Sequence, residues 1–364
     1  MIFNLSWQMF LMWLVGGLLI YLAIRKNMEP ALLLPMGFGA ILVNLPNSSL
    51  IGNNGAIEIL FNFGIEMGEL FPLLLFIGIG AMIDFEPLLM NPKLFLLGLA
   101  AQIGIIITLF LARLFGFNIA DAISIGIIGA ADGPTAIYVS QVLNSNYIAA
   151  IMVAAYSYMA LVPIIQPPLI KLVTTRKERC IRMDYSTKSI KKVVKILFPI
   201  IVSIIAGIIA PASSALIGFL MFGNLIKESG VLKTLSETAQ NILANLITLL
   251  LGISIAFQMT ADKFINWNTL LIMGLGFIAF IFDTIGGVLF AKMLNIFSKK
   301  KINPMVGAAG ISAFPMSARV VHKLGLEEDS SNFLLIHAAG ANVSGQIASV
   351  IIGGLLLSIG QSII

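Results

Sequence analysis

The sequence of 364 residues has few charged residues, only one cysteine and only two histidines. Charged residues make up 11% of the chain, whereas soluble domains carry about 25%. The single Cys180 excludes a disulfide within the chain, and two histidines are too few for a His-rich metal site. With 59% hydrophobic residues and a mean hydropathy of +1.00, the composition indicates a polytopic membrane protein with little chain left for a soluble domain.

Ten apolar runs have about the length that a transmembrane helix needs. They lie near residues 8–24, 31–45, 57–83, 93–115, 147–173, 193–209, 213–226, 237–259, 266–297 and 331–359. Two further stretches, 119–140 and 303–322, are rich in Gly, Ala and Pro and fit poorly as spans. We interpret both as re-entrant hairpins, so the predicted fold class is an all-α polytopic membrane protein with about ten transmembrane helices.

The distribution of Lys and Arg predicts the orientation, because basic loops stay in the cytoplasm. Nine basic residues lie between Lys171 and Lys195, so this segment should be cytoplasmic. The same rule places Arg25-Lys26, residues 84–93 and residues 299–301 in the cytoplasm, and the loop 46–56, which has no basic residue, outside. The net charge of +5 therefore gives no reason to expect a nucleic-acid partner.

Five spans in each half is an odd number, which predicts that the two halves are inverted repeats. The first repeat covers residues 1–173 and the second covers residues 193–364, with a basic cytoplasmic loop at 174–192 between them. Each repeat contains one of the two hairpins. Inverted repeats with broken elements that meet at mid-membrane are the layout of many secondary transporters.

Asp132 is the acid of the first hairpin, and Gly133-Pro134 follow it directly. An acid at the centre of a membrane helix costs about 2.5–3.5 kcal/mol on insertion scales. Broken backbone at this depth is tolerated only where protein buries it or water reaches it. A carboxylate beside free carbonyl groups suits a small cation, and the alternative is a short extramembrane loop that carries an Asp.

Polar side chains also occur inside the apolar runs. Tyr156 and Tyr158 are placed in the middle of one run, where they serve either function or hydrogen bonding between helices. In the last run, Asn342 and Ser349 are seven residues apart and share a helix face, with Ser344 between them. The alternative for this run is a seam of small residues that lets helices pack closely.

Two further charged residues are candidates for a functional role. Arg319 follows the second hairpin, where it either holds a carboxylate bidentately or snorkels to the membrane surface. Asp283 is another acid inside an apolar run, with Lys292 as a potential partner.

The sequence resembles the membrane-embedded beta subunits of sodium-pumping, biotin-dependent decarboxylases. That family includes the oxaloacetate, methylmalonyl-CoA, glutaconyl-CoA and malonate enzymes. The resemblance rests on seven segments that extend over nearly the whole chain: 78–85, 129–137, 154–168, 223–225, 282–284, 312–320 and 332–349. One departure is Gly340-Ala341, where the family has a glycine-proline run.

The resemblance implies a subunit in the bacterial inner membrane that decarboxylates carboxybiotin, exports sodium ions and consumes a proton. Biotin would arrive on a partner, because the chain has no Met-Lys-Met sequence. A carboxyltransferase, a biotin carrier and a small membrane subunit are the expected partners, and a homo-oligomer is expected. The residues that match the family's ion and proton positions are Asp132, Tyr158 and Asn342, with Ser349 or else Ser344 as the serine. Residue chemistry alone predicts instead a sodium-coupled transporter of a small carboxylate, and a third alternative is a structural membrane anchor.

Overall fold

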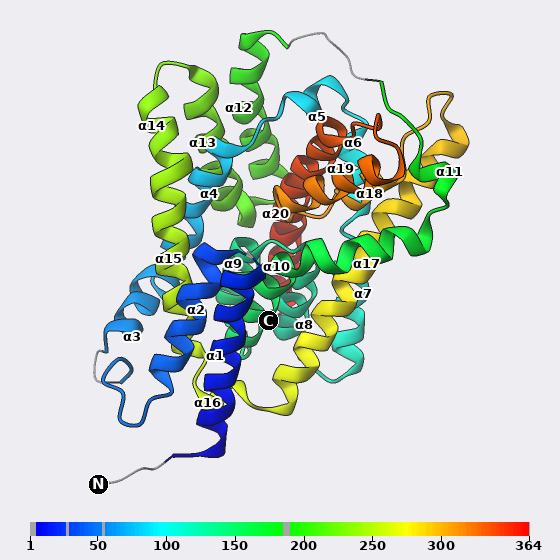
Figure 1. Cartoon of the computed structure of the whole chain (residues 1–364). Helices are drawn as coiled ribbons and strands as arrows, with labels where there is room; N and C mark the ends of the chain where they lie inside the picture. Colours follow the sequence, from blue (N-terminus) through cyan, green and yellow to red (C-terminus); the bar gives the residue numbers. More distant parts are fainter. Residues whose placement is uncertain (1–4, 27–28, 53–54, 185–189, 364) are drawn as a thin grey trace.

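The computed structural model describes residues 5–26, 29–52, 55–184 and 190–363. These residues form helices and connecting segments without any β-strand. Figure 1 shows most of the long helices running along one direction of the molecule, while the green second half of α10 crosses it. The prediction of an all-α protein is therefore confirmed for the described part of the chain.

The first half contains ten α-helices together with a π-helical segment, η1, and a 3₁₀ segment, η2. In chain order they are α1 (Trp7–Lys26), α2 (Pro30–Val43), α3 (Ala56–Phe61), η1 (Asn62–Glu66), α4 (Leu70–Met82), α5 (Glu86–Met90), α6 (Leu94–Ala100), α7 (Ile103–Leu114), α8 (Ile119–Gly126), η2 (Ile127–Ala130), α9 (Gly133–Val142) and α10 (Ile148–Val173).

The second half is also helical and ends in two long helices that flank a short broken element. In chain order its elements are α11 (Arg176–Arg179), α12 (Lys192–Ile209), η3 (Pro211–Ser213), α13 (Ser214–Ser229), α14 (Lys233–Glu237), η4 (Thr238–Leu243), α15 (Ala244–Ile255), η5 (Ala256–Gln258), α16 (Ala261–Phe264), α17 (Trp267–Phe297), α18 (Met305–Ala308), α19 (Met316–Glu328) and α20 (Leu335–Ile363).

Six described helices are long and apolar enough to cross a membrane, and the number rises to eight if two bent pairs are each counted as one span. The predicted count of ten is not confirmed, because several apolar runs form short or bent helices. The run 57–83 bends by 65° between Ala56–Glu66 and Leu70–Met82, and α10 bends by 65° near its middle. The run 31–45 forms α2, whose 14 residues extend only about 21 Å at 1.5 Å per residue.

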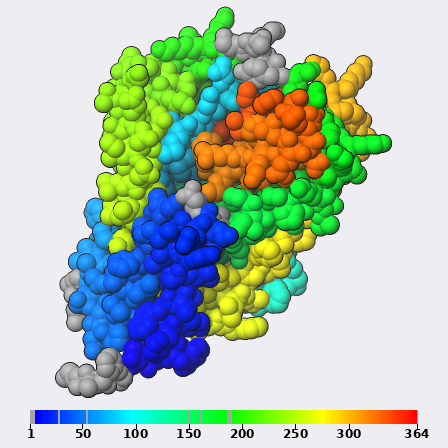
Figure 2. Space-filling model, viewed as in Figure 1, coloured from blue at the N-terminus to red at the C-terminus, as the bar shows by residue number. Residues whose placement is uncertain are grey.

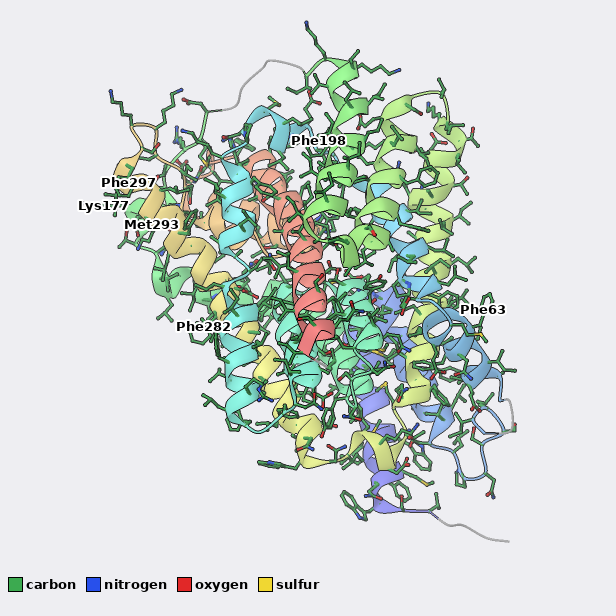
Figure 3. The ribbon with its side chains drawn as sticks, turned by 180° about the vertical axis from the view of Figure 1, so that it is seen from behind. Phe63, Lys177, Phe198, Phe282, Met293 and Phe297 are labelled. Atoms are coloured by element: carbon green, nitrogen blue, oxygen red, sulfur yellow. The ribbon has the colours of Figure 1, made fainter. Side chains whose placement is uncertain are left out.

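The outer surface is strongly apolar, as expected for a protein surrounded by lipid. Figure 3 shows Phe63, Phe282, Met293 and Phe297 projecting outward from the ribbon, and each exposes at least 40% of its surface. A soluble protein rarely exposes contiguous apolar surface on this scale. The side chains at the periphery therefore fit a hydrocarbon environment.

The segments rich in Lys and Arg gather at one end of the molecule. In Figure 1, α5, α11 and the end of α17 lie at the upper end, whereas α3 and α16 lie at the lower end. The upper ends of α1 and α2 lie at mid-height instead, level with α9 and α10. The end of α1, which carries Arg25-Lys26, therefore lies beside the interior elements, away from the other basic segments.

Candidate cation site

The first predicted hairpin consists of a helix, a break and a second helix. Hydrogen bonds join the beginning of the hairpin to its end. Asp121 in α8 accepts hydrogen bonds from Ser145 Oγ (2.7 Å) and from the Asn146 backbone N–H (2.9 Å). The chain therefore returns to the level at which it started. It reverses at Ala131, which adopts a left-handed conformation with φ 52°, and α9 then begins at Gly133-Pro134, where proline is favoured because the first helical N–H needs no partner.

The second hairpin, formed by α18 and α19, is anchored at the basic end. Asn303 Nδ2 and Asn332 Nδ2 both donate to the Arg179 carbonyl, at 2.8 and 2.9 Å. The hairpin therefore begins and ends at one point of the basic segment. Its second arm continues to Glu328, beyond the predicted end at residue 322.

The tips of the two hairpins meet inside the protein. The Ala130 carbonyl accepts hydrogen bonds from the Ser312 backbone N–H (3.0 Å) and from Ser312 Oγ (2.9 Å). Gln166 in α10 secures the second hairpin, because its Nε2 donates to the Ala308 carbonyl (2.8 Å) and its Oε1 accepts from Ser317 Oγ (2.9 Å). Two broken elements from distant parts of the sequence thus end against each other.

Asp132 lies at this junction and is only 3% exposed. Its Oδ2 accepts hydrogen bonds from Thr135 Oγ1 (2.6 Å), Gln346 Nε2 (2.8 Å) and Ser349 Oγ (3.0 Å). The structure therefore brings Asp132 and Ser349 together. Gln346 was missing from the predicted site, although it lies three residues before Ser349 and shares its helix face.

Asn342 and Ser344 have different surroundings. Asn342 Nδ2 donates to the Ile311 carbonyl of the second hairpin (2.6 Å), whereas its Oδ1 is buried and has no partner among the described residues. Ser344 Oγ donates to the Leu94 carbonyl in α6 (2.9 Å). Asn342 thus contacts a hairpin tip, and Ser344 faces another helix. Of the two predicted serines, only Ser349 contacts Asp132.

The two tyrosines of α10 face in different directions. The Tyr156 ring packs against the backbone at Gly133, where an added methyl group would overlap it, and the phenol oxygen is buried without a partner among the described residues. Tyr158 points to α17 and donates to the Met273 carbonyl. Tyr156 is therefore the tyrosine that contacts the first hairpin.

The remaining predicted residues lie apart from the Asp132 carboxylate. Arg319 is exposed on α19 and forms none of the ion pairs found among the described residues. Asp283 accepts from the Gly104 N–H (2.5 Å), and its buried Oδ2 lies against Gly129 without a described partner. The suggested partner Lys292 pairs with Glu178 instead (3.0 Å).

A cavity of about 200 Å³ adjoins Asp132. It is bounded by both hairpin tips, by α10 and α20, and by α2, α4 and α15. The polar residues that line it are Glu29, Asp132, Tyr156, Asn245, Thr248, Ser312 and Gln346. Glu29 is a second carboxylate at this cavity that the sequence analysis did not single out.

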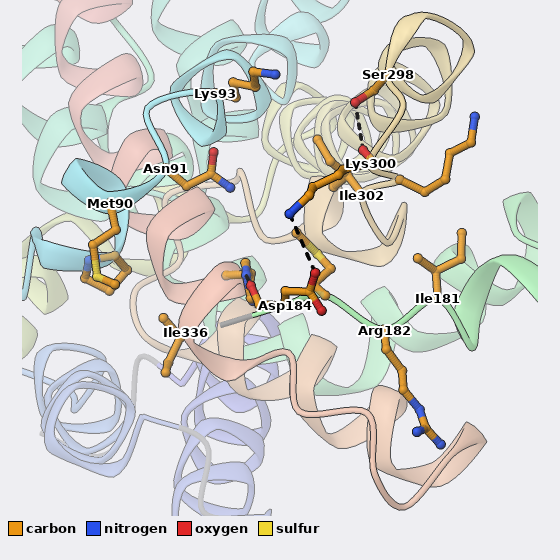
Figure 4. Close-up of a pocket in the computed structure, with 14 residues that line it drawn as sticks. Met90, Asn91, Lys93, Ile181, Arg182, Asp184, Ser298, Lys300, Ile302 and Ile336 are labelled. Carbon is orange, nitrogen blue, oxygen red and sulfur yellow. Dashed lines mark hydrogen bonds and ion pairs between the residues drawn. The ribbon is translucent and has the colours of Figure 1, made fainter. Parts of the chain in front are cut away.

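A second cavity of about 420 Å³ lies at the basic end and is drawn in Figure 4. Lys93, Arg182, Lys300 and Lys301 contribute to its lining, against one acid, Asp184. Lys300 approaches Asp184 at 3.8 Å. The surplus of cationic side chains suits an anionic group.

Comparison with known proteins identifies the family of this chain. Residues 8–360 match the family described as the Na⁺-transporting oxaloacetate decarboxylase beta subunit. The chain belongs to this family. It is 46% identical to the glutaconyl-CoA decarboxylase subunit beta of Acidaminococcus fermentans over 97% of this chain and 93% of the relative. It is also 46% identical to the methylmalonyl-CoA decarboxylase subunit beta of Veillonella parvula, with 96% and 92% covered, and 42% identical to a probable oxaloacetate decarboxylase beta chain of Vibrio cholerae, with 98% and 96% covered.

Family membership confirms the resemblance stated above. The protein is an integral membrane subunit of a Na⁺-transporting decarboxylase, and a multi-subunit complex follows from the beta-subunit names of its relatives. A sodium-coupled carboxylate transporter and a structural anchor find no support among these relatives.

Proposed function

We propose that this subunit decarboxylates carboxybiotin delivered by a partner subunit and uses the reaction to export sodium through a site centred on Asp132. Decarboxylation of the N-carboxybiotin anion consumes one proton and yields carbon dioxide and neutral biotin. The observation that carries the proposal is the buried Asp132 carboxylate at the junction of two hairpin tips, with neutral hydrogen-bond donors on one of its oxygens.

A single carboxylate suits a monovalent cation for electrostatic reasons. One negative charge offsets one sodium ion, and neutral amide, hydroxyl and carbonyl oxygens can complete the shell without adding charge. The occupied site is then close to neutral. An empty site would leave an uncompensated buried carboxylate, which is costly, so a proton that replaces sodium at Asp132 would restore the balance.

Asn342 is proposed as a neutral ligand of the same ion. Its amide nitrogen is already bonded to the Ile311 carbonyl, which fixes the side chain. The buried Oδ1 has no described partner and is therefore free to accept a cation. Ser349 would contribute its hydroxyl oxygen. Ser344 is the weaker candidate, because it bonds to α6.

Tyr158 and Arg319 are proposed for the reaction with carboxybiotin. Tyr158 would transfer the proton, for which its hydrogen bond to the Met273 carbonyl must break. Arg319 is exposed and carries no described ion pair, so its guanidinium can receive a carboxylate bidentately. Tyr158→Phe should abolish turnover, and Arg319→Lys should lose activity while sodium still binds, because an ammonium lacks the planar fork. Wild-type decarboxylation rates in either variant would exclude that residue.

The test of the central proposal is sodium-dependent decarboxylation of carboxybiotin by the purified complex. Asp132→Asn keeps the size of the side chain and removes its charge, so sodium activation should disappear. Asn342→Asp adds a charge beside the ion and should retain sodium binding but slow its release. If Asp132→Asn keeps the wild-type sodium dependence, the ion binds elsewhere and Asp283 becomes the next carboxylate to examine.

The proposal includes inverted repeats of residues 1–173 and 193–364, with both termini outside. It is supported by the two hairpins, which approach their junction from opposite ends of the molecule in Figure 1. A cysteine introduced at Ser49 should react with an impermeant thiol reagent from outside, whereas Cys180 should react only from the cytoplasm. The opposite labelling pattern would refute this orientation.

A carboxyltransferase, a biotin carrier and a small membrane subunit are the proposed partners, and the bacterial cell membrane is the proposed location. The cationic cavity at the basic end, lined by Lys93, Arg182 and Lys300 among others, is our proposed contact for the carrier. Replacing these three residues by Gln should weaken binding of the isolated carrier domain in a pull-down assay. Unchanged carrier binding would place the contact elsewhere.

A further inference from the structure

Asp283 is a second acid inside a membrane helix, and the proposed function gives it no role. It lies in α17, and its exposed fraction is 0%. The preceding residue, Phe282, projects outward in Figure 3 and is 40% exposed. The carboxyl group of Asp283 therefore belongs to the side of α17 that packs against the protein interior.

One oxygen of Asp283 lies at an interruption in the membrane span Leu94–Leu114. This span consists of α6 and α7, and α7 begins at Ile103 after a turn at Ala101-Gln102. The first N–H groups of a helix have no acceptor within that helix. The Gly104 N–H donates to Asp283 Oδ1 (2.5 Å). A side chain of α17 thus supplies an acceptor that the interrupted backbone of α7 lacks.

Two glycines leave room for this carboxyl group between neighbouring elements. A methyl group added at Gly104 in α7 would lie 2.7 Å from Asp283 Oδ1, and one added at Gly129 in η2 would lie 2.5 Å from Asp283 Oδ2. The segment η2 leads through Ala131 directly to Asp132. Asp283 therefore contacts both the interrupted span and the segment that carries the candidate cation site.

The two buried acids have opposite surroundings. Asp132 Oδ2 accepts three hydrogen bonds from side chains, whereas Asp283 Oδ2 has no partner among the described residues. Lys292 in the same helix pairs with Glu178 and does not offset a charge on Asp283. An ionised carboxylate with one bare oxygen is costly in such an inaccessible position. A protonated carboxyl group is neutral and has an O–H donor.

We propose that Asp283 is a neutral, protonated acid that positions the first hairpin tip for sodium binding. Its Oδ1 holds the start of α7, and its O–H group is expected to donate to the Ala279 carbonyl, whose oxygen lies against the same Gly104 position. The elements α7 and η2 are then fixed on one face of α17, so that Asp132 stays at the junction of the tips. This inference rests on the proposed function, because it assigns the sodium ion to Asp132.

The geometry separates Asp283 from the proposed proton carrier. Tyr158 donates to the Met273 carbonyl, which lies ten residues before Asp283 in α17 (283 − 273), or about 15 Å at 1.5 Å per residue. Between them, Gly276 packs against the Tyr158 ring and Ile128. In Figure 2 the second half of α10, in green, covers the middle of α17, in yellow. We therefore expect Asp283 to keep its proton during turnover.

The experiment measures sodium activation of decarboxylation by the purified complex across a range of pH. Asp283→Asn keeps the Oδ1 acceptor, a donor at the second position and the neutral charge, so its sodium dependence and pH profile should match the wild type. Asp283→Leu removes both polar atoms at similar size. It should raise the sodium concentration for half-maximal activity about tenfold, equivalent to 1.4 kcal/mol, and leave the rate at saturating sodium largely intact.

Gly129→Ala tests the same contact from the hairpin side. Its added methyl group meets Asp283 Oδ2, so the half-maximal sodium concentration should rise in the same way, and this variant decides the question even if Asp283→Leu fails to assemble. Gly274→Ala is the matched control on α17, because a methyl group added there meets no atom within 4 Å. The control should behave like the wild type.

Two results would overturn the inference. A changed pH profile or lost sodium activation in Asp283→Asn would show that the carboxyl group is charged during the cycle. Wild-type sodium dependence in either Asp283→Leu or Gly129→Ala would show that this contact does not position the site. The proposed function is tested separately by Asp132→Asn. If that variant keeps the wild-type sodium dependence while Asp283→Asn loses it, sodium binds at Asp283, and both the inference and the proposed function fail.

Discussion

The hydrogen bonds of Asp121 join the two ends of the first hairpin. They allow a direct test of whether the geometry of this hairpin controls the cation site. Asp121 accepts hydrogen bonds from Ser145 Oγ (2.7 Å), from the Asn146 backbone N–H (2.9 Å) and Nδ2 (3.2 Å), and from Asn118 Nδ2 (2.7 Å). All four contacts are donated to the carboxylate oxygens, by three residues. A hydrogen bond to a charged group contributes about 1.5–3 kcal/mol.

Asp121→Ala removes all four bonds at once. Asp121 and Ser145 are buried, whereas Asn118 and Asn146 are exposed. The donors of the two asparagines therefore regain water in the variant, and we expect a net loss of about 3 kcal/mol. At 1.4 kcal/mol per factor of ten, this corresponds to a shift of roughly 150-fold toward a hairpin with separated ends. The backbone N–H of Ser145, which donates to the Ser140 carbonyl at 2.9 Å, reports the opening without contacting Asp121.

Two measurements check this expectation. Hydrogen exchange at the Ser145 amide should accelerate by up to the stated factor, and the sodium concentration for half-maximal decarboxylation should rise at least tenfold. The matched control is Ser140→Ala, because its hydroxyl makes only a local bond to the Ala136 carbonyl within α9 (2.6 Å). An Asp121→Ala variant with faster exchange but wild-type sodium dependence would refute control of the site by the hairpin base.

Two further predictions follow from other contacts. Gly133→Ala adds a methyl group that overlaps the Tyr156 ring, so sodium activation should be lost, and the double variant with Tyr156→Leu should recover part of it in the same decarboxylation assay. Hydrogen bonds from Lys195 and from the Ile190 N–H lower the pKa of Glu86. The contact therefore contributes stability, about 1 kcal/mol, at pH values above the unfolded pKa of 4.5. This stability is lost as the pH falls through the lower pKa of the folded state. Glu86→Gln should reproduce that loss at neutral pH as faster hydrogen exchange at Ile190, and unchanged exchange there would contradict it.

The interrupted elements could be predicted from sequence because their signals are local. Gly133-Pro134 opens α9 directly after Asp132, and the second stretch rich in Gly, Ala and Pro likewise forms two short helices with a break between them. The number of spans could not be predicted in the same way. Hydropathy measures how apolar a run is, whereas the 65° bends in the run 57–83 and in α10 depend on packing against neighbouring helices.

The polar residues on one face of α20 show which site residues helical periodicity can predict. Asn342, Gln346 and Ser349 are related by steps of four and three residues, so they share one helix face. Ser344 does not belong to that stripe, and its hydroxyl bonds to α6. Applied to every polar residue of the last span, the same spacing rule would have selected Gln346 and rejected Ser344.

No spacing pattern in the sequence indicated a role for Glu29. In the sequence it is an acid in a short turn before Pro30, which is an ordinary arrangement at a helix start. Its significance arises from a cavity shared with Asp132, 103 residues further along (132 − 29). Only the tertiary arrangement that sets the start of α2 beside α15 and the hairpin tips brings the two carboxylates to one space, and no local pattern encodes it.

The polar side chains within the apolar runs serve two purposes that sequence alone cannot separate. A broken helix leaves carbonyl groups without partners, and in a membrane the protein itself must satisfy them. Gln166 does so for the Ala308 carbonyl, Asn342 for the Ile311 carbonyl and Ser312 for the Ala130 carbonyl. The donor of each side chain is therefore used to stabilise a hairpin. The atoms available to an ion are the oxygens that remain, and at Asn342 this oxygen is buried without a described partner. Asn342 can thus hold the second hairpin with its nitrogen and bind sodium with its oxygen, which couples the ion to the hairpin tip through one side chain.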